Sequence, residues 1–190
     1  MRKKLLVLCA VLLIAGSALA QSPAKFGVGA FGGVSIPVLQ EDQGNGTEFG
    51  LKGRWGLGSL IVLEPYFSAT KWGDPDPVDV GGGGTFDLGI AGSKVTSFGV
   101  DAVLGNGVGK MGIAPYFTAG IGSFKVKNDD TGFDHSSFGM TAGLGLGIGL
   151  TPQLGLDVRG KFVVMPQDPD GSKKAVGVVA GVNYTFGVGI

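Results

Sequence analysis

"FGMTAGLGLGIGL", residues Phe138 to Leu150, combines two patterns in one short stretch. The even-numbered positions carry mainly large apolar side chains, whereas the odd-numbered positions carry only glycine or threonine. Alternation with a period of two predicts a β-strand, because successive side chains of a strand point to opposite faces. This strand must lie between an apolar environment and one with little room for side chains.

Glycine is frequent along the whole chain, with 38 among 190 residues, which is about three times the usual share. Each glycine inside a helix costs about 1 kcal/mol relative to alanine. The glycines here run through the apolar segments and are not confined to turns. The composition therefore favours an all-β fold.

The first twenty residues have the pattern of a secretory signal. Three basic residues at 2–4 precede an apolar run at 5–14, and a small-x-small end follows at 18–20. This pattern predicts a signal peptide, residues 1–20, that is removed, and one domain, residues 21–190. An uncleaved membrane anchor is the alternative, but the apolar run is too short to span about 30 Å of hydrocarbon.

Cysteine and charge limit the chemistry of the mature chain. Cys9 leaves with the signal, and Leu8 disfavours a lipid anchor there because such a signal needs a small residue at that position. The remaining chain has no cysteine for a disulfide or a thiolate. Removing three basic residues changes 15 basic against 15 acidic to 12 against 15, a net charge of −3. This balance argues against nucleic acid as a partner.

Eight segments repeat the alternation, which predicts eight strands. They are 25–36, 47–57, 60–72, 94–104, 111–126, 138–150, 154–164 and 175–186. Residues 85–92 keep the register of the strand that follows, and they either extend it or form a separate element. Short connections alternate with long polar ones, which are 37–46, 73–84, 128–135 and 165–173. This alternation predicts an antiparallel up-and-down barrel.

The two faces decide what surrounds the barrel. The non-apolar face is mostly glycine, serine and threonine, which suits the narrow interior of eight strands better than a solvated exterior. The apolar faces of eight strands do not fit into that interior. Turned outward into lipid they need no protein partner, and closure of the barrel pairs every backbone polar group. The sequence therefore predicts an eight-stranded antiparallel transmembrane β-barrel.

Two stretches near the end of the chain carry a family resemblance. "GLGLGIGLTPQLGLDVRGKF" (143–162) and "AVGVVAGVNYTF" (175–186) resemble the last strands of OmpA/OmpX-type eight-stranded outer-membrane β-barrel proteins. The resemblance implies a location in the outer membrane, with its lipid, the periplasmic chaperones and the barrel-assembly machinery as partners. It also implies that Tyr184 and Phe186 form the assembly signal of the final strand.

The inward face collects eight charged residues, four acidic and four basic. They are Glu48, Lys52, Arg54, Glu64, Asp101, Asp157, Arg159 and Lys161. A turn at Gly58-Ser59 would place Arg54 directly opposite Glu64. Unpaired buried charge is very costly, so these residues are interpreted as an ionic network that closes the lumen. The alternative is a gated path for ions or small solutes.

Other motifs carry weaker chemistry. Asp134, His135 and Ser136 are the residue types of a hydrolase triad, but adjacent residues do not satisfy its geometry. Asp74, Asp76, Asp79, Asp168 and Asp170 supply oxygen ligands for calcium without the full EF-hand spacing. Gly27 to Gly32 matches GxGxxG but precedes no helix. No catalytic residue, metal site or cofactor is predicted.

These observations predict a non-enzymatic integral outer-membrane protein that contributes to envelope structure or presents extracellular interaction loops. The partner of such loops stays unknown. The alternatives are a narrow channel for small ions or apolar solutes and a secreted lipocalin-like binder.

Overall fold

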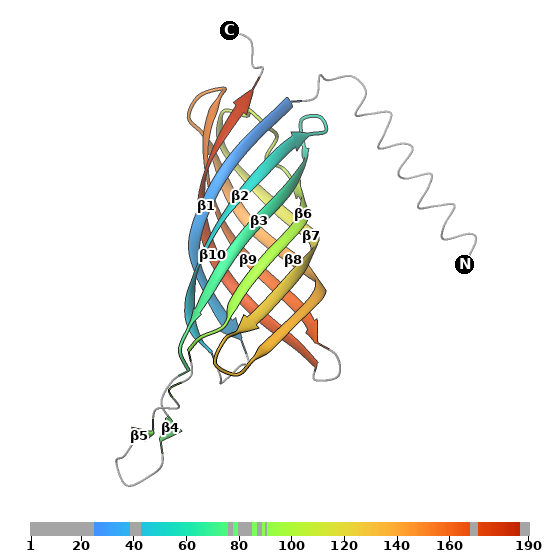
Figure 1. Ribbon diagram of the computed structural model, residues 1–190. Coiled ribbons are helices and arrows are strands. Elements are labelled where there is room, and N and C mark those ends of the chain that lie inside the picture. Colours follow the sequence, from blue (N-terminus) through green and yellow to red (C-terminus); the bar gives the residue numbers. More distant parts are fainter. Residues whose placement is uncertain are drawn as a thin grey trace, which may run out of the picture.

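Eight long strands close into one antiparallel barrel in the computed structural model (Figure 1). The structure describes residues 25–38, 43–75, 78–79, 85–86, 89, 91–167 and 171–186. Around the barrel the order is β1-β10-β9-β8-β7-β6-β3-β2, so β1 closes against β10. The barrel strands are β1 Lys25–Val38, β2 Gly44–Gly56, β3 Ile61–Gly73, β6 Lys94–Leu104, β7 Gly112–Asn128, β8 Phe133–Gly149, β9 Leu154–Gln167 and β10 Gly171–Phe186. The predicted eight-stranded antiparallel up-and-down β-barrel is confirmed.

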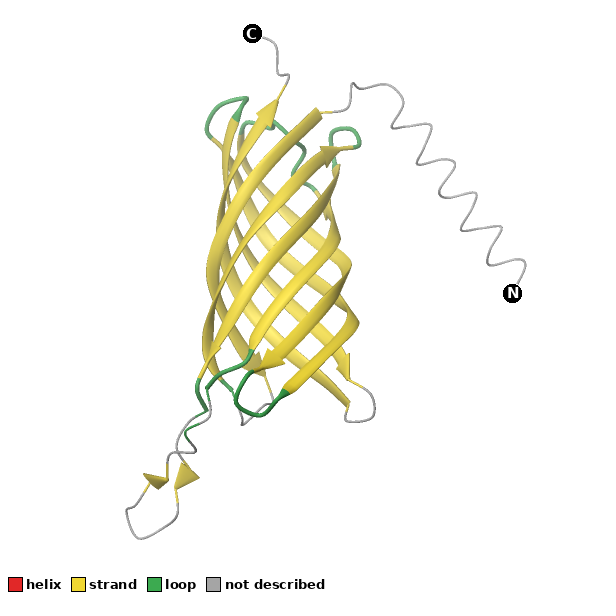
Figure 2. Ribbon diagram, viewed as in Figure 1, coloured by secondary structure: helices red, strands yellow, loops and turns green. Residues whose placement is uncertain are grey.

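The described part of the chain is built of strands and the loops between them (Figure 2). No helix within it is both long enough and apolar enough to span a membrane.

The two ends of the barrel differ. At the turn end, β1 begins, β10 ends and three turns join the other strands (Figure 1). The predicted turn at Gly58 is one of them, and this glycine has a φ of 103°. At the loop end lies the connection 74–93, which contains β4 (Val78–Asp79) and β5 (Thr85–Phe86). These two strands pair with each other as a separate sheet, so the region does not extend β6.

Three of the four connections predicted to be long are in fact short. The strands continue further toward the loop end than expected, and β7 and β8 pair as far as Asn128 and Phe133. The sequence pattern does not predict these strand ends, because the apolar residues move there from the outward to the inward positions of the strand. Phe124 and Val126 are 3% and 1% exposed and point inward, whereas Lys125 points outward. Backbone pairing does not need an apolar outer face, so the strands extend past the apolar band.

The opening stretch has the two predicted faces. Phe138 is 81% exposed on the outside of β8, and Leu144 is 69% exposed. The glycines between them face the lumen. From the sequence, we expect these glycines to make room for Arg159 and Lys161 of the next strand, but the side chain that lies over Gly145 is a different one. A Cβ atom at Gly145 would overlap the ring of Tyr116 from β7, because that side chain lies across the glycine.

Buried apolar side chains form one cluster toward each end of the lumen. The loop-end cluster comprises Trp72, Val95, Phe124, Val126, Val163, Met165 and Ala175. The turn-end cluster comprises Val62, Val103, Val108 and Tyr116. Val108 comes from the turn between β6 and β7 and is 5% exposed. The charged part of the lumen is therefore bordered by apolar side chains toward both ends.

Candidate functional site

The eight charged residues of the predicted network all lie inside the barrel. They come from strands β2, β3, β6 and β9, whose alternation turns every second side chain toward the lumen. Seven of the eight residues are at most 7% exposed, and Lys161 is only partly buried. Each of the eight makes at least one ion pair: Lys52, Arg54, Arg159 and Lys161 with Glu48, Glu64, Asp101 and Asp157.

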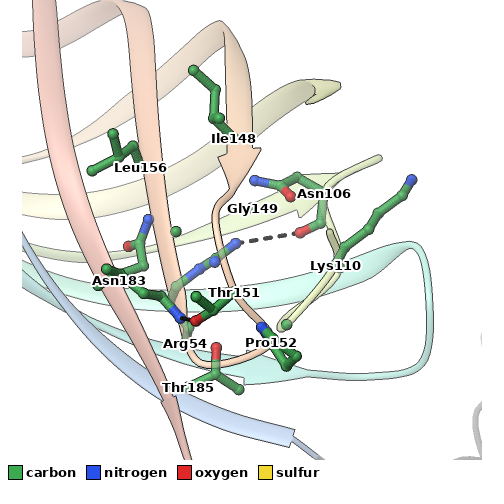
Figure 3. Close-up of a pocket in the computed structure, with 14 residues that line it drawn as sticks. Arg54, Asn106, Lys110, Ile148, Gly149, Thr151, Pro152, Leu156, Asn183 and Thr185 are labelled. Carbon is green, nitrogen blue, oxygen red and sulfur yellow. Dashed lines mark hydrogen bonds between the residues drawn. The ribbon is translucent and has the colours of Figure 1, made fainter. Parts of the chain in front are cut away.

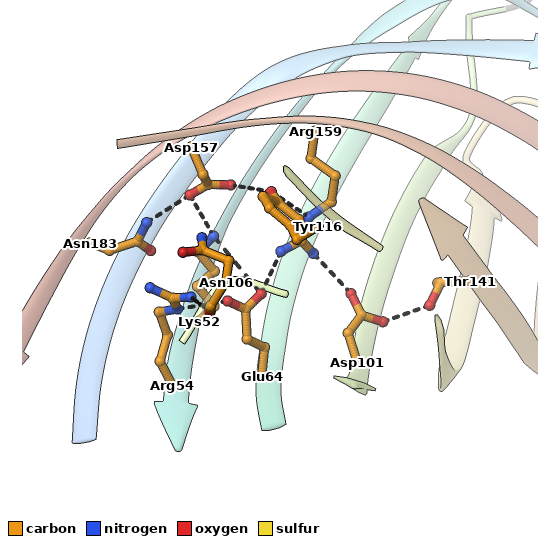
Figure 4. A network of polar contacts seen from close by, with 10 residues as sticks. All are labelled: Lys52, Arg54, Glu64, Asp101, Asn106, Tyr116, Thr141, Asp157, Arg159 and Asn183. Carbon is orange, nitrogen blue, oxygen red and sulfur yellow. Dashed lines mark hydrogen bonds and ion pairs between the residues drawn. The ribbon is translucent and has the colours of Figure 1, made fainter. Parts of the chain in front are cut away.

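Glu64 is the centre of the network and contacts three cations (Figure 4). Arg54 Nε donates to Glu64 Oε1 at 2.7 Å, and Arg159 Nη2 donates to Oε2 at 2.5 Å. Lys52 Nζ lies 3.9 Å from Oε2. In the β2–β3 ladder, Lys52 pairs with Tyr66 and Trp55 pairs with Leu63. This register places Arg54 directly across from Glu64. One carboxylate therefore joins residues from three strands.

Arg159 carries the network across the lumen to β6. Its Nη1 donates to Asp101 Oδ2 at 3.1 Å, while the hydroxyl of Thr141 donates to Asp101 Oδ1 at 2.6 Å. Its guanidinium also lies over the ring of Tyr116, 5.4 Å from the centroid. Both oxygens of Asp101 are thus engaged.

Asp157 forms a second centre on β9. Lys52 Nζ and Asn183 Nδ2 donate to Oδ1 at 2.8 and 2.7 Å. The hydroxyl of Tyr116 donates to Oδ2 at 3.0 Å and accepts a hydrogen bond from Arg159 Nε at 3.3 Å. Tyr116 therefore connects the two centres. The sequence does not single it out, because the network is predicted from charged residues and a phenol is neutral.

Lys161 and Glu48 form a third pair, closer to the loop end. The ring of Phe31 separates this pair from the rest, with Lys52 Nζ and Lys161 Nζ each 6.0 Å from its centroid. An aromatic face attracts cations, so Phe31 keeps the two ammonium groups apart without opening space between them.

Almost no space is left among these side chains. The cavity between Phe31, Tyr66 and the ion pairs measures about 20 Å³. A second cavity, at the turn end, is also about 20 Å³. Figure 3 shows Arg54 there, where Nη2 donates to the carbonyl oxygen of Asn106 at 3.3 Å. Such a volume admits about one water molecule, so neither cavity is an open path.

The contact between Gly145 and Tyr116 can be tested directly. Gly145→Ala is expected to lower the free energy of unfolding by about 1–3 kcal/mol, because the new methyl group displaces a ring that is held by two hydrogen bonds. Urea titration in lipid vesicles measures the change. Gly160→Ala is the control, since a Cβ there meets only a carbonyl oxygen at 3.9 Å. Equal losses in the two variants would contradict the assignment.

The other candidate motifs do not assemble into sites. Asp134, His135 and Ser136 are successive residues of β8 and alternate between the two faces of the wall. Among the described residues, no group of three potential metal-ligating side chains exists. Asp76, Asp168, Asp170 and the side chain of Asp79 lie outside the described part, whereas Asp74 accepts a hydrogen bond from the amide of Gly92. Gly27 to Gly32 lies within β1.

The residues of the implied assembly signal lie on the outer face of β10 at the turn end. The rings of Tyr184 and Phe186 form an edge contact with centroids 5.2 Å apart. Phe186 stands opposite Phe26 in the ladder that closes the barrel, and Phe26 stacks on Trp55 at 6.0 Å. The predicted signal peptide, residues 1–20, lies outside the described residues.

A closed barrel of eight strands with an apolar exterior and a polar, filled lumen is the architecture of small outer-membrane proteins. The family of the outer membrane protein beta-barrel domain matches residues 6–186. The chain belongs to this family. It is therefore an integral protein of the outer membrane, and its apolar face contacts lipid.

Solved structures agree on the fold of this outer-membrane barrel. Neisserial surface protein A has a TM-score of 0.69 at 16% identity, covering 87% of this chain and 100% of that one. A major outer membrane protein from Thermus thermophilus has a TM-score of 0.54 at 17% identity, covering 87% and 100%. The N-terminal barrel domain of Pseudomonas aeruginosa OprF has a TM-score of 0.51 at 18% identity, covering 85% and 97%. No curated protein sequence matches the chain with significance.

Proposed function

We propose that this outer-membrane barrel is a closed, non-enzymatic protein whose buried ion pairs act as a structural plug of the lumen. The observation that carries the proposal is the pairing of all eight charged residues of the network, six of which line a cavity of only about 20 Å³. A conducting pore needs ion sites that an ion can enter and leave. Here each charge already has a fixed partner of opposite sign.

The barrel then serves the envelope as a transmembrane body that presents the small sheet of β4 and β5 at the cell surface. This orientation places the start of β1 and the end of β10 on the periplasmic side. The end of the loop, residues 91–93, is held from several sides. Its backbone amides donate to Asp130, Asp74 and Gln43, at 2.7, 2.8 and 2.7 Å. A firm base suits a loop that contacts a partner outside the cell.

Biogenesis completes the proposal. Residues 1–20 direct export and are cleaved, periplasmic chaperones carry the chain, and the barrel-assembly machinery reads Tyr184 and Phe186 on the final strand. Their position at the closing seam supports this role, because both aromatic rings face outward and are about half exposed.

The test of the plug is conductance. Planar bilayers containing the wild-type protein, or the Glu64→Gln variant, are expected to keep their baseline conductance, because neither lumen holds more than a few waters. Heat-modifiable migration on a gel confirms that each preparation contains folded barrel, and a porin serves as the conducting control. Stepwise conductance of the wild-type protein would overturn the proposed function.

A further inference from the structure

An open cleft lies between two turns at the turn end of the barrel. It is lined by Lys25, by residues 58–60 of the β2–β3 turn and by residues 107–110 of the β6–β7 turn, and it measures about 630 Å³. Ligand pockets of proteins measure about 300–1,000 Å³. The cleft is therefore large enough to hold part of a partner molecule.

The β6–β7 turn separates this cleft from the charged network of the lumen. Asn106 is 8% exposed on the lumen side, where its carbonyl oxygen accepts a hydrogen bond from Arg54. Gly107, Gly109 and Lys110 line both the small cavity beside Arg54 and the open cleft. Figure 3 shows the end of the Lys110 side chain directed away from Arg54. A molecule in the cleft therefore contacts this turn on the side away from the ion pairs.

Hydrogen bonds hold both turns in place, so the cleft exists before a partner binds. The amide of Gly105 donates to the carbonyl oxygen of Leu60 at 2.8 Å and joins the two turns. The amide of Leu57 donates to the carbonyl oxygen of Ile61 at 2.8 Å. Val108 anchors the β6–β7 turn in the lumen, where it is 5% exposed. A preformed surface loses less conformational entropy when it binds a partner.

The ionisable side chains of the cleft are both basic. Lys25 and Lys110 are exposed, and Lys110 Nζ lies 3.5 Å from the carbonyl oxygen of Gly105. The described residues at the turn end include no aspartate or glutamate; they are 25, 56–61, 104–113, 149–155 and 184–186. Among these residues the two ammonium groups have no carboxylate to pair with. The cleft therefore favours an anionic partner.

Lys25 faces the mouth of the lumen and not the bilayer. Phe26 and Val28 lie on the outer face of β1 and are 52% and 50% exposed, whereas Gly27 is buried. Alternation along a strand places Lys25 on the same face as Gly27. Its charge is therefore directed toward the solvent at the mouth of the barrel.

The rest of the lining combines backbone groups with an apolar side chain. Gly58, Gly107 and Gly109 have no side chains, so the backbone itself borders the cleft. Leu60 is 60% exposed beside them. An extended peptide has parts that match all three features, because it offers backbone hydrogen-bonding groups together with acidic and apolar side chains.

We propose that this cleft docks an acidic, extended peptide segment of a periplasmic protein. Carboxylates of the segment pair with Lys25 and Lys110, and an apolar side chain between them packs on Leu60. The periplasmic location rests on the orientation given in the proposed function. A small anion would use the lysines alone and leave Leu60 and the turn backbone uncovered, so a peptide fits the cleft better. In this way the barrel anchors a soluble protein to the outer membrane.

Fluorescence polarisation of a labelled hexapeptide, SLEVDS, with the full barrel in dodecyl maltoside tests the cleft. Lys25→Gln/Lys110→Gln is expected to weaken binding about tenfold, because each exposed ion pair contributes up to about fivefold. Leu60→Asn is expected to weaken it about fivefold, through the loss of one partly covered apolar side chain. The neutral peptide SLQVNS is expected to bind the wild type as weakly as SLEVDS binds the lysine variant.

Two matched controls remove similar groups elsewhere. Lys71→Gln/Lys94→Gln takes the same charge from exposed positions at the loop end. Leu150→Asn replaces a leucine that is 49% exposed on a neighbouring turn and does not line the cleft. Both are expected to stay within about twofold of the wild type. Heat-modifiable migration verifies that each variant is folded.

Four results would overturn the proposal. They are the absence of saturable SLEVDS binding, equal binding of SLQVNS, a control that loses as much affinity as its cleft counterpart, and tighter binding of acetate or phosphatidylglycerol to the two lysines. The last result would assign the lysines to a small anion or to a lipid headgroup.

Binding in detergent does not depend on the orientation of the barrel or on whether the lumen conducts. Ser59→Cys tests the orientation separately, because residues 21–190 contain no cysteine and Ser59 is exposed at the cleft. A membrane-impermeant maleimide is expected to label this variant only after the outer membrane is permeabilised. Labelling of intact cells would overturn the periplasmic partner, whereas conductance of the wild-type protein would overturn the closed lumen alone.

Discussion

Replacing Glu64 with glutamine is expected to lower the free energy of unfolding by about 3–5 kcal/mol, because removal of one partner leaves buried charges without compensation. Glu64 contacts Arg54, Arg159 and Lys52, and it is 2% exposed. Without its carboxylate, the guanidinium of Arg54 loses its anionic partner and keeps only neutral acceptors, among them the backbone carbonyl of Asn106. Glutamine has nearly the same shape, so the loss measures charge and not packing.

Urea titration in phospholipid vesicles, followed by tryptophan fluorescence, measures this loss. Asp134→Asn is the control, because it breaks an exposed ion pair whose side chains are 53% and 47% exposed; such pairs contribute about 0–1 kcal/mol. Adding Arg54→Gln to Glu64→Gln should recover part of the stability. A loss no larger than that of the control would show that the ion pairs do not hold the barrel together.

Trp72→Ala is expected to cost about 3–5 kcal/mol, through lost contacts and the cavity left behind. Trp72 is 1% exposed in the loop-end cluster, and its indole Nε1 donates to Ser35 Oγ at 3.2 Å. The surrounding strands are fixed in a closed ladder, so they cannot collapse into the vacated volume.

Fluorescence of the remaining Trp55, at the turn end, follows unfolding of this variant. Phe138→Ala is the control, because its ring faces lipid and acyl chains fill the space it leaves. It should therefore lack the cavity contribution and lose clearly less stability. Equal losses would mean that the loop-end cluster is loosely packed and does not close the lumen.

The sequence predicts the architecture well because one physical pattern governs it. The alternation in Phe138 to Leu150 separates lipid from lumen, and the same alternation selects the inward charged residues. The pair Arg54 and Glu64 is also accessible to sequence reasoning, since a short turn fixes the register between their strands. Local chemistry is sufficient for these inferences.

Contacts across the lumen are not accessible in the same way. Lys52 and Asp157 are 105 residues apart, and they meet because of the tilt and curvature of the closed wall. The loop-end cluster is not accessible from the sequence for another reason. The sequence does show apolar residues moving to the other face of the strand at Phe124 and Lys125. This pattern looks the same as that of an ordinary amphipathic strand. The bulk of Tyr116 over Gly145 likewise depends on packing between strands.

The long-range ion pairs have a consequence for how the barrel finds its shear. In a glycine-rich strand such as β8, slipping by two residues keeps every apolar side chain in lipid, so hydrophobicity alone does not penalise the wrong alignment. The charged side chains are not repetitive, and a slip would separate Glu64 from Arg159, its partner 95 residues away. The ion pairs of the lumen therefore also select the register of the closed barrel. They stabilise the correct alignment over alignments shifted by two residues, in which the apolar side chains contact lipid equally well.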